Sequence, residues 1–435
     1  MPRVRLLPRD DDQSGWIQVL PPRPTTQKLA GAQTADCAVI GAGFVGLSIA
    51  RRLKQLRPDW SVAVVDAQKV GYGASGRSSG FLVDVNDHAG RVARPVRESY
   101  AQLARSGIET LRSLVATHNI DCAWDETGWI RACAGKQGRA ALDRTCKVYD
   151  ELGCRYERLD HEGMFEVTGS RFYRSGVRLP GYPLVQTAAL VRGLADSLPE
   201  GTEIYEESPV VGLEPGPPHV LTTPNGSIQA DRLFLATNGY TPFLGYERNR
   251  ILPLLTFASM TRVLTAAEQA ELGGEREWGV LSADPMGSSV RRTRDQRLLI
   301  RNTALHSGKL EVSEQRKRWI LENHRTAFES RFPGLRDLEF DYTWGGLLGT
   351  SANGQMSFGE RARQLYIVAA FTATGIAVGT AAGCAIVDLS LGEDSKELCD
   401  AKALPKPTWL PPNPFRSIGG GIVTALMNRQ AGAYL

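Results

Sequence analysis

Three glycines and one acidic residue stand at spacings that could bind a dinucleotide. Gly41, Gly43 and Gly46 follow the apolar run 37–40, and Asp66 ends a second apolar run. In such a pattern the first glycine makes a tight turn, the second lets the main chain approach a pyrophosphate, and the third lets a helix pack closely on a strand. The acid can accept hydrogen bonds from a ribose diol, which disfavours a 2′-phosphate. The spacing therefore predicts a dinucleotide site.

The elements that must position these residues form a strand–helix–strand unit over residues 36–66. We expect a strand at 37–40, a helix over 47–56 and a second strand at 61–65, all indicated by their apolar patterns. The start of the helix would offer free N–H groups to a phosphate. The residues expected to contact the dinucleotide are Gly41, Gly43, Phe44, Val45, Gly46, Asp66 and Ala67.

Residues 70–81 form a run of glycines and serines directly after this unit. Their main chain could lie against a flat ring, although alone the run would indicate only a flexible loop. In this position it resembles the GASGRNGG-type segment of the D-amino-acid-oxidase-like flavoproteins, especially the γ-glutamylputrescine oxidase-like branch, and glycine and sarcosine oxidases. The resemblance implies FAD as the cofactor, and its contacts here would be Gly73, Ala74, Ser75, Arg77, Ser78, Ser79 and Gly80.

Two later segments resemble the same superfamily and follow in its order. Residues 208–240 read as small hairpins and a returning strand, and the resemblance places Val210 and Val211 against adenine. The turn Ala236, Thr237, Asn238 and Gly239 would then lie near the pyrophosphate. Residues 344–378 resemble the C-terminal flavin segment, which implies that Gly346, Gly375 and Ile376 lie beside the ring, where helix N–H groups would stabilise the reduced anion.

Departures from the family pattern bear on the flavin. Residues 370–375 differ from the usual GYSGHG, which puts the surroundings of the ring in doubt. Gly345 stands where monomeric sarcosine oxidases carry the cysteine that links to the flavin, so we expect non-covalent FAD.

The hairpin 289–301 resembles the R-x-T-x-DGRLL hairpin of the family's substrate domain. Strand alternation would point Val290, Arg292 and Arg294 to one face. We therefore expect Arg292 or Arg301 to anchor a substrate carboxylate, because a guanidinium fits a planar anion. Trp344 is expected as a pocket wall and Thr374 as a polar contact.

The resemblance implies oxidation of the CH–NH bond of an amine, with hydride transfer to flavin N5 and hydrolysis of the imine. The arginine-rich hairpin favours a secondary amine with a carboxylate, such as an N-substituted glycine, sarcosine or iminodiacetate. O2, giving H2O2, is the expected acceptor, but Leu299 matches the lysine that sarcosine oxidases use to assist oxygen, so a dehydrogenase stays open. A γ-glutamylputrescine-like amine, a D-amino-acid dehydrogenase and a non-catalytic FAD-binding subunit are the alternatives.

Composition narrows the class of protein. The net charge of +4, from 51 basic and 47 acidic residues, argues against a nucleic-acid partner. Seven scattered cysteines without a CxxC pair indicate reduced thiols, and no metal-ligand spacing occurs. With no signal-peptide pattern, we expect a cytoplasmic protein and leave an oligomer open. Residues 364–387 carry no charge, but their Ala, Gly and Thr content predicts a buried strand, turn and helix rather than a transmembrane segment.

The order of these motifs predicts an α/β fold of the GR2 flavoprotein type, with two interleaved domains. A Rossmann-like FAD-binding domain is expected over residues 30–85, 175–245 and 340–395. An α+β substrate domain, built on an antiparallel sheet, is expected over residues 86–174 and 246–339. Residues 1–29 would form an N-terminal extension and residues 396–435 a C-terminal tail. The Pro-rich run 406–415 and the Gly-rich run 418–422 indicate that this tail is extended.

Overall fold

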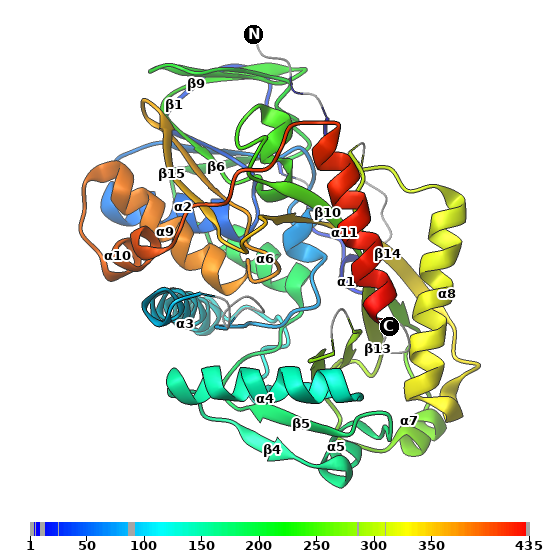
Figure 1. Ribbon diagram of the computed structural model, residues 1–435. Helices are drawn as coiled ribbons and strands as arrows, with labels where there is room; N and C mark the ends of the chain where they lie inside the picture. Colours follow the sequence, from blue (N-terminus) through cyan, green and yellow to red (C-terminus); the bar gives the residue numbers. More distant parts are fainter. Residues whose placement is uncertain are drawn as a thin grey trace.

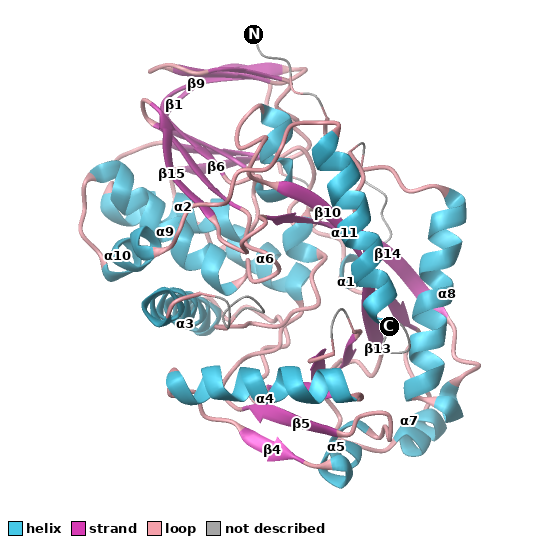
Figure 2. Ribbon diagram, in the orientation of Figure 1, coloured by secondary structure: helices cyan, strands magenta, loops and turns pink. Residues whose placement is uncertain are grey.

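Two eight-stranded sheets organise the chain in the computed structural model (Figures 1 and 2), which describes residues 4, 6–8, 14–24, 26–85, 92–284, 287–308 and 310–431. The fold is mixed α/β, as expected, and the chain passes repeatedly from one sheet to the other. No helix among the described residues combines the length and apolar character needed to cross a bilayer.

The first sheet is the predicted nucleotide-binding sheet. Five strands run parallel in the order β16 (Leu365–Ala369), β9 (Gly226–Leu235), β1 (Gly31–Ile40), β2 (Val62–Val65) and β6 (Thr202–Tyr205). Antiparallel additions are β15 (Ser357–Ala362), β7 (Gly212–Glu214) and β8 (His219–Thr222). The β1–α2–β2 unit is confirmed, with α2 at Phe44–Leu56.

Small residues let three helices pack tightly against one another beside this sheet. Helix α9 (Ala377–Leu391) consists mainly of Ala, Gly and Thr and is buried along most of its length between α2 and α3 (Arg94–Thr117). A Cβ on Gly107 of α3 would lie 1.9 Å from the carbonyl oxygen of Ala377, so only glycine permits this approach. The uncharged stretch 364–387 is therefore a buried strand, turn and helix, as its composition predicted.

The second sheet is antiparallel except for one parallel pair, β3 with β11. Its strands run in the order β14 (Phe340–Thr350), β10 (Leu252–Thr261), β13 (Leu298–Leu305), β12 (Ser289–Arg292), β11 (Trp278–Ser282), β3 (Trp129–Cys133), β5 (Ser175–Leu179) and β4 (Glu157–Leu159). The associated helices are α4 (Lys136–Glu151), α5 (His161–Thr168), α7 (Ala266–Leu272) and α8 (Glu314–Arg331). Helix α6 (Thr187–Asp196) returns the chain to the first sheet.

Three segments lie on the other side of the expected division. Strands β5 and β14, placed by the sequence in the FAD-binding domain, pair within the second sheet. Helix α3, placed in the substrate domain, packs on α9 and α10 (Lys396–Ala403) in the core of the first sheet. The sequence pattern predicts whether a segment is a strand or a helix. Which sheet the segment joins depends on contacts with segments far away in the sequence.

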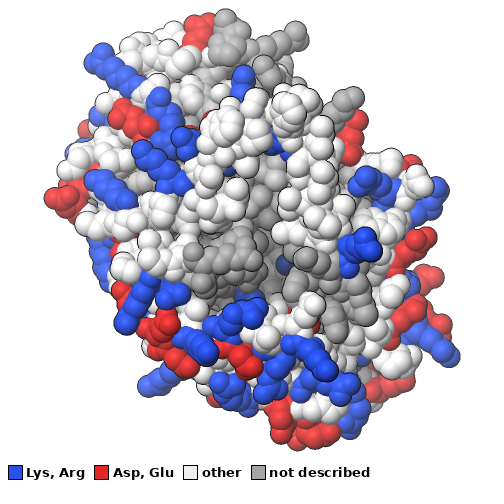
Figure 3. All heavy atoms as spheres, viewed as in Figure 1, with Lys and Arg blue, Asp and Glu red and all other residues white. Residues whose placement is uncertain are grey.

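The described residues near both termini pack against other segments. In the N-terminal extension, α1 (Gly15–Gln18) is buried through Trp16 and Ile17. At the other end the expected extended tail is wrong beyond residue 414, because the glycine-rich run lies inside helix α11 (Phe415–Ala431), which packs on β13. The outer side of α11 carries exposed apolar side chains, and uncharged atoms cover this strip in Figure 3.

Candidate functional site

A cavity of about 350 Å³ lies between the two sheets and collects most of the predicted site residues. Of the predicted cofactor residues, all but Gly46 and Val211 line it. Arg301, Trp344 and Thr374 line it as well, whereas Arg292 does not. The cavity brings together segments that lie far apart in the chain, including Val4, Leu6, Leu7 and Pro8 of the N-terminal extension.

The glycine turn after β1 forms one end of this cavity. Asp66 Oδ2 accepts a hydrogen bond from the main-chain N–H of Ala42 at 2.7 Å, which holds the carboxylate beside the turn. A Cβ on Gly46 would lie 1.8 Å from the carbonyl oxygen of Gly41, so its role is close packing rather than contact with a ligand. Helix α2 begins at Phe44 with its N-terminus at the cavity, where it can bind a phosphate.

The glycine- and serine-rich loop forms the middle of the wall. Ser75 Oγ accepts from the N–H of Phe44 at 3.2 Å and joins the loop to the start of α2. Ser78 Oγ is buried and has no hydrogen-bond partner among the described residues. An orphaned hydroxyl that lines a cavity indicates a missing polar ligand, because buried polar groups are nearly always paired.

A turn between β16 and α9 also lines the cavity. Three of its residues that are not glycine, Ala370, Thr372 and Ala373, adopt positive φ values of 67°, 47° and 71°. Asn238 Oδ1 accepts from the N–H of Ala370 at 3.0 Å, and the Thr374 hydroxyl hydrogen-bonds both the Phe371 carbonyl and the Tyr100 hydroxyl. These contacts hold a strained turn whose sequence departs from the glycine-rich family pattern.

The start of α9 lies at this turn. Gly375 and Ile376 line the cavity, and no side chain caps the helix. Its N–H groups and dipole can therefore stabilise negative charge in the cavity.

The second sheet supplies the remaining wall. Arg301 of β13 is half-buried at the cavity and donates to Ser289 Oγ at 3.1 Å. Thr256 and Phe257 of β10, with Leu281 of β11, also line this side. The wall is mostly apolar with one cationic side chain, which suits a small organic anion.

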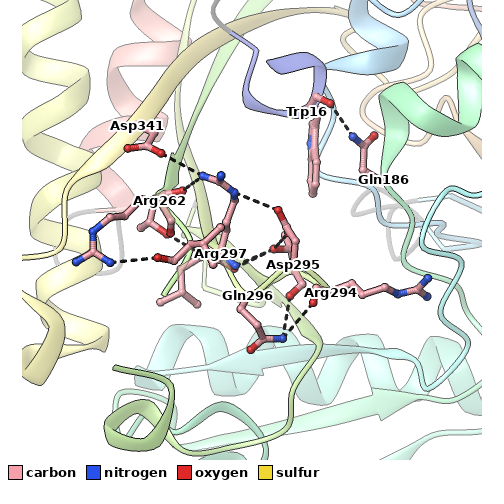
Figure 4. A network of polar contacts seen from close by, with 12 residues as sticks. Trp16, Gln186, Arg262, Arg294, Asp295, Gln296, Arg297 and Asp341 are labelled. Carbon is pink, nitrogen blue, oxygen red and sulfur yellow. Dashed lines mark hydrogen bonds and ion pairs between the residues drawn. The ribbon is translucent and has the colours of Figure 1, made fainter. Parts of the chain in front are cut away.

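Arg292 lies on the other face of the sheet, which corrects the expectation that it faces the cavity. Its Nε donates to Gln296 Oε1 at 2.9 Å, and its Nη1 donates to the carbonyls of Gly273 at 2.7 Å and Glu275 at 3.1 Å. Gln296 belongs to the hairpin turn. Its Nε2 donates to the carbonyl of Arg294 within the turn and to the carbonyl of Arg276 before β11. Figure 4 shows the polar contacts of this turn. Alternation holds for Val290 and Arg292 but fails for Arg294, because β12 ends at Arg292 and Arg294 pairs with Glu277, as Arg291 does. Alternation also does not say which face of the sheet lines the cavity.

Sequence reasoning missed several residues at the site. Trp16 of the N-terminal extension donates from Nε1 to the carbonyl of Ser78 at 2.8 Å. Arg291, adjacent to Arg292, is 1% exposed and donates to the carbonyls of Ser79 at 3.0 Å and Val185 at 2.7 Å. Burial lowers the pKa of Arg291 to about 10, so the guanidinium stays charged at neutral pH. No local pattern distinguishes these residues from ordinary core residues.

The residues present fit FAD. The glycine turn and the start of α2 suit a pyrophosphate, Asp66 suits a ribose, and the orphaned Ser78 hydroxyl lies in the adjoining loop. The start of α9 lines the same cavity.

Comparison with known proteins agrees with this geometry. The family described as "FAD dependent oxidoreductase" (DAO) matches residues 36–389. The chain is 27% identical to the "Probable oxidoreductase OrdL" of Rhizobium meliloti, over 92% of this chain and 94% of that protein. It is 26% identical to the γ-glutamylputrescine oxidoreductase of Escherichia coli, over 83% of this chain and 84% of that protein.

Solved structures show the same fold. Glycine oxidase from Geobacillus kaustophilus superposes with a TM-score of 0.70 at 21% identity, over 83% of this chain and 96% of the oxidase. The protein therefore belongs to the FAD dependent oxidoreductase family.

Proposed function

We propose that the protein oxidises the CH–NH bond of a secondary amine that carries a carboxylate, such as an N-substituted glycine. The observation that carries the proposal is Arg301, a cation from the second sheet that lines the same cavity as the loop 73–80 and the start of α9. A guanidinium at this place can bind a carboxylate through two hydrogen bonds and orient the amine.

The chain's own residues bind and orient in this proposal. FAD, when bound non-covalently, supplies the redox chemistry by accepting a hydride from the substrate. Loss of that hydride and of the amine proton leaves an imine, which water hydrolyses. Phe257 and Leu281 would exclude water from the substrate, and Thr374 would offer a hydroxyl at the turn before α9. O2 is the proposed acceptor, with H2O2 as product.

A γ-glutamylputrescine-like amine is the second candidate substrate. It is favoured by the 26% identity to the Escherichia coli γ-glutamylputrescine oxidoreductase over most of both chains. Such a substrate also carries a carboxylate, so Arg301 does not separate the two candidates, and direct assay must do so.

An anaerobic panel tests the proposal. Sarcosine, iminodiacetate, γ-glutamylputrescine and D-alanine are added separately to the purified yellow protein, and the flavin absorbance is followed before and after air is admitted. We expect sarcosine or iminodiacetate to bleach the flavin. The flavin absorbance should then recover in air as H2O2 is formed. Bleaching by γ-glutamylputrescine alone would select the second candidate, and bleaching without recovery in air would indicate another acceptor. A flavin that no amine bleaches would contradict the proposed substrate class.

A further inference from the structure

Three consecutive main-chain carbonyls of the loop 77–79 are bound by three buried side chains from distant elements. Trp344 Nε1 on β14 donates to the Arg77 carbonyl at 3.1 Å, and Trp16 Nε1 on α1 donates to the Ser78 carbonyl at 2.8 Å. Arg291 on β12 donates to the Ser79 carbonyl at 3.0 Å. We call Trp16, Trp344 and Arg291 the carbonyl clamp.

The clamp decides which groups of the loop are left for a ligand. Its donors occupy the carbonyl oxygens from the protein side, while the residues of the loop line the cavity. Within the described chain, the N–H groups of Ser78, Ser79 and Gly80 donate to no protein acceptor, and Ser78 Oγ is buried without a partner. The loop therefore keeps its donors for a ligand that offers acceptor oxygens and nitrogens.

Trp16 is fixed in place independently of the loop. Its carbonyl accepts from Gln186 Nε2 at 2.6 Å, a contact drawn in Figure 4. Trp16 belongs to one buried cluster with Trp344, Met260 and Leu299, and the guanidinium of Arg291 lies 5.4 Å from its ring centroid. These contacts let one residue of the N-terminal extension act as a rigid donor.

We propose that Trp16 is a positioning residue for the flavin: through the Ser78 carbonyl it turns the N–H groups of the loop toward the cofactor, so the N-terminal extension is part of the FAD site. The inference rests on the proposed function only in placing the flavin against residues 77–80. It predicts that loss of one indole N–H changes the affinity and the electronic environment of FAD, and that the extension is not a passive cover.

The test compares two tryptophan variants in the full-length protein. Trp16→Phe keeps an aromatic ring but removes the donor to Ser78. Trp278→Phe is the matched control, because Trp278 is 1% exposed and its Nε1 has no hydrogen-bond partner among the described residues. For each variant we would measure the FAD dissociation constant of the apoprotein, the visible circular dichroism of the bound flavin and its midpoint potential.

We expect Trp16→Phe to weaken FAD binding about tenfold, because it removes the shorter of the two hydrogen bonds to the Ser78 carbonyl and leaves only the one from Thr187 Oγ1 at 3.3 Å. We also expect it to shift the flavin spectrum and potential, with Trp278→Phe leaving all three unchanged. Equal behaviour of the two variants, with any loss confined to the unfolding midpoint, would overturn the proposal and make Trp16 a core residue only.

A second variant covers the case in which Trp16→Phe does not fold. Gln186→Glu keeps the acceptor that caps α6 through the N–H of Ala189 but removes the donor to the Trp16 carbonyl. We expect the same direction of change with a smaller size, and an unchanged flavin would contradict the proposal. None of these measurements uses an amine, so a failed substrate panel leaves their outcome intact.

Discussion

The two walls of the cavity differ in the kind of group that forms them: main-chain groups in one wall and side chains in the other. On the side of the first sheet, main-chain groups form the wall, at the glycine turn, the loop 73–80 and the starts of α2 and α9. On the side of the second sheet, side chains form it, chiefly Arg301, Phe257 and Leu281. A main-chain wall constrains sequence at a few glycines, whereas a side-chain wall can change its chemistry without changing the fold. The first wall therefore identifies the family, and the second must select the substrate.

The largest effect is expected where the main-chain wall depends on a missing Cβ. Gly46→Ala would place a Cβ 1.8 Å from the Gly41 carbonyl oxygen, so the turn must move. We expect FAD binding to weaken by about a hundredfold or more, since such a clash costs roughly 3 kcal/mol or more. FAD titration of the purified apoprotein measures this. Gly421→Ala is the control, because a Cβ there would meet nothing within 4 Å. If Gly46→Ala bound FAD as tightly as the wild type, the main-chain wall would not depend on glycine at this position.

A smaller effect should separate two arginines of one hairpin. Arg301→Met removes the proposed anchor, and we expect kcat/KM for a carboxylate-bearing amine to fall about 10- to 100-fold, mainly through KM. Arg292→Met should instead lower the free energy of unfolding by about 2–3 kcal/mol, because the carbonyls of Gly273 and Glu275 lose a buried donor. Steady-state kinetics and urea unfolding measure the two. If Arg292→Met lowered kcat/KM and Arg301→Met lowered only the stability, the face of the sheet that lines the cavity would have been misidentified.

The smallest expected effect is a pH dependence at the point where the extension joins the first wall. Glu206 accepts from Thr26 and from the N–H of Val70, and it pairs with Arg23. Burial raises the pKa of the Glu206 carboxyl, but these hydrogen bonds and the arginine outweigh burial and lower the pKa below its ordinary value of 4.5. The carboxylate therefore stabilises the fold fully above about pH 4.5, and this contribution is lost as pH falls through the lower folded pKa.

Glu206→Gln is the variant that tests this dependence. At neutral pH we expect it to be less stable than the wild type by about 1–2 kcal/mol, the usual contribution of charge-assisted hydrogen bonds. The difference should shrink toward zero below the folded pKa. Urea midpoints between pH 3 and pH 7 would show it, and a constant difference across this range would mean that Glu206 acts through packing alone.

Much of the first wall was predictable because its signals are local. The unit from Gly41 to Asp66 lies within a few tens of residues, and every role in it follows from the size of glycine or the charge of one acid. Likewise, the Ala- and Gly-rich composition of α9 predicts that this helix is buried. The turn 370–375 was predicted as an element, although its positive φ values at Ala370, Thr372 and Ala373 were not.

The second wall and the clamp were not predictable in the same way. Whether Arg291 or Arg292 faces the cavity depends on how β12 lies against β13 and the first sheet, which a period of two cannot decide. Nothing in the sequence around Trp16 indicates its hydrogen bond to the Ser78 carbonyl, which lies 62 residues away in the chain. The amino-acid sequence by itself determined the dinucleotide-binding unit, because that unit depends on short-range geometry, and the order of its segments resembled a family that binds FAD. Only the tertiary structure decided which side chains meet the cavity, because that depends on contacts between segments far apart in the chain.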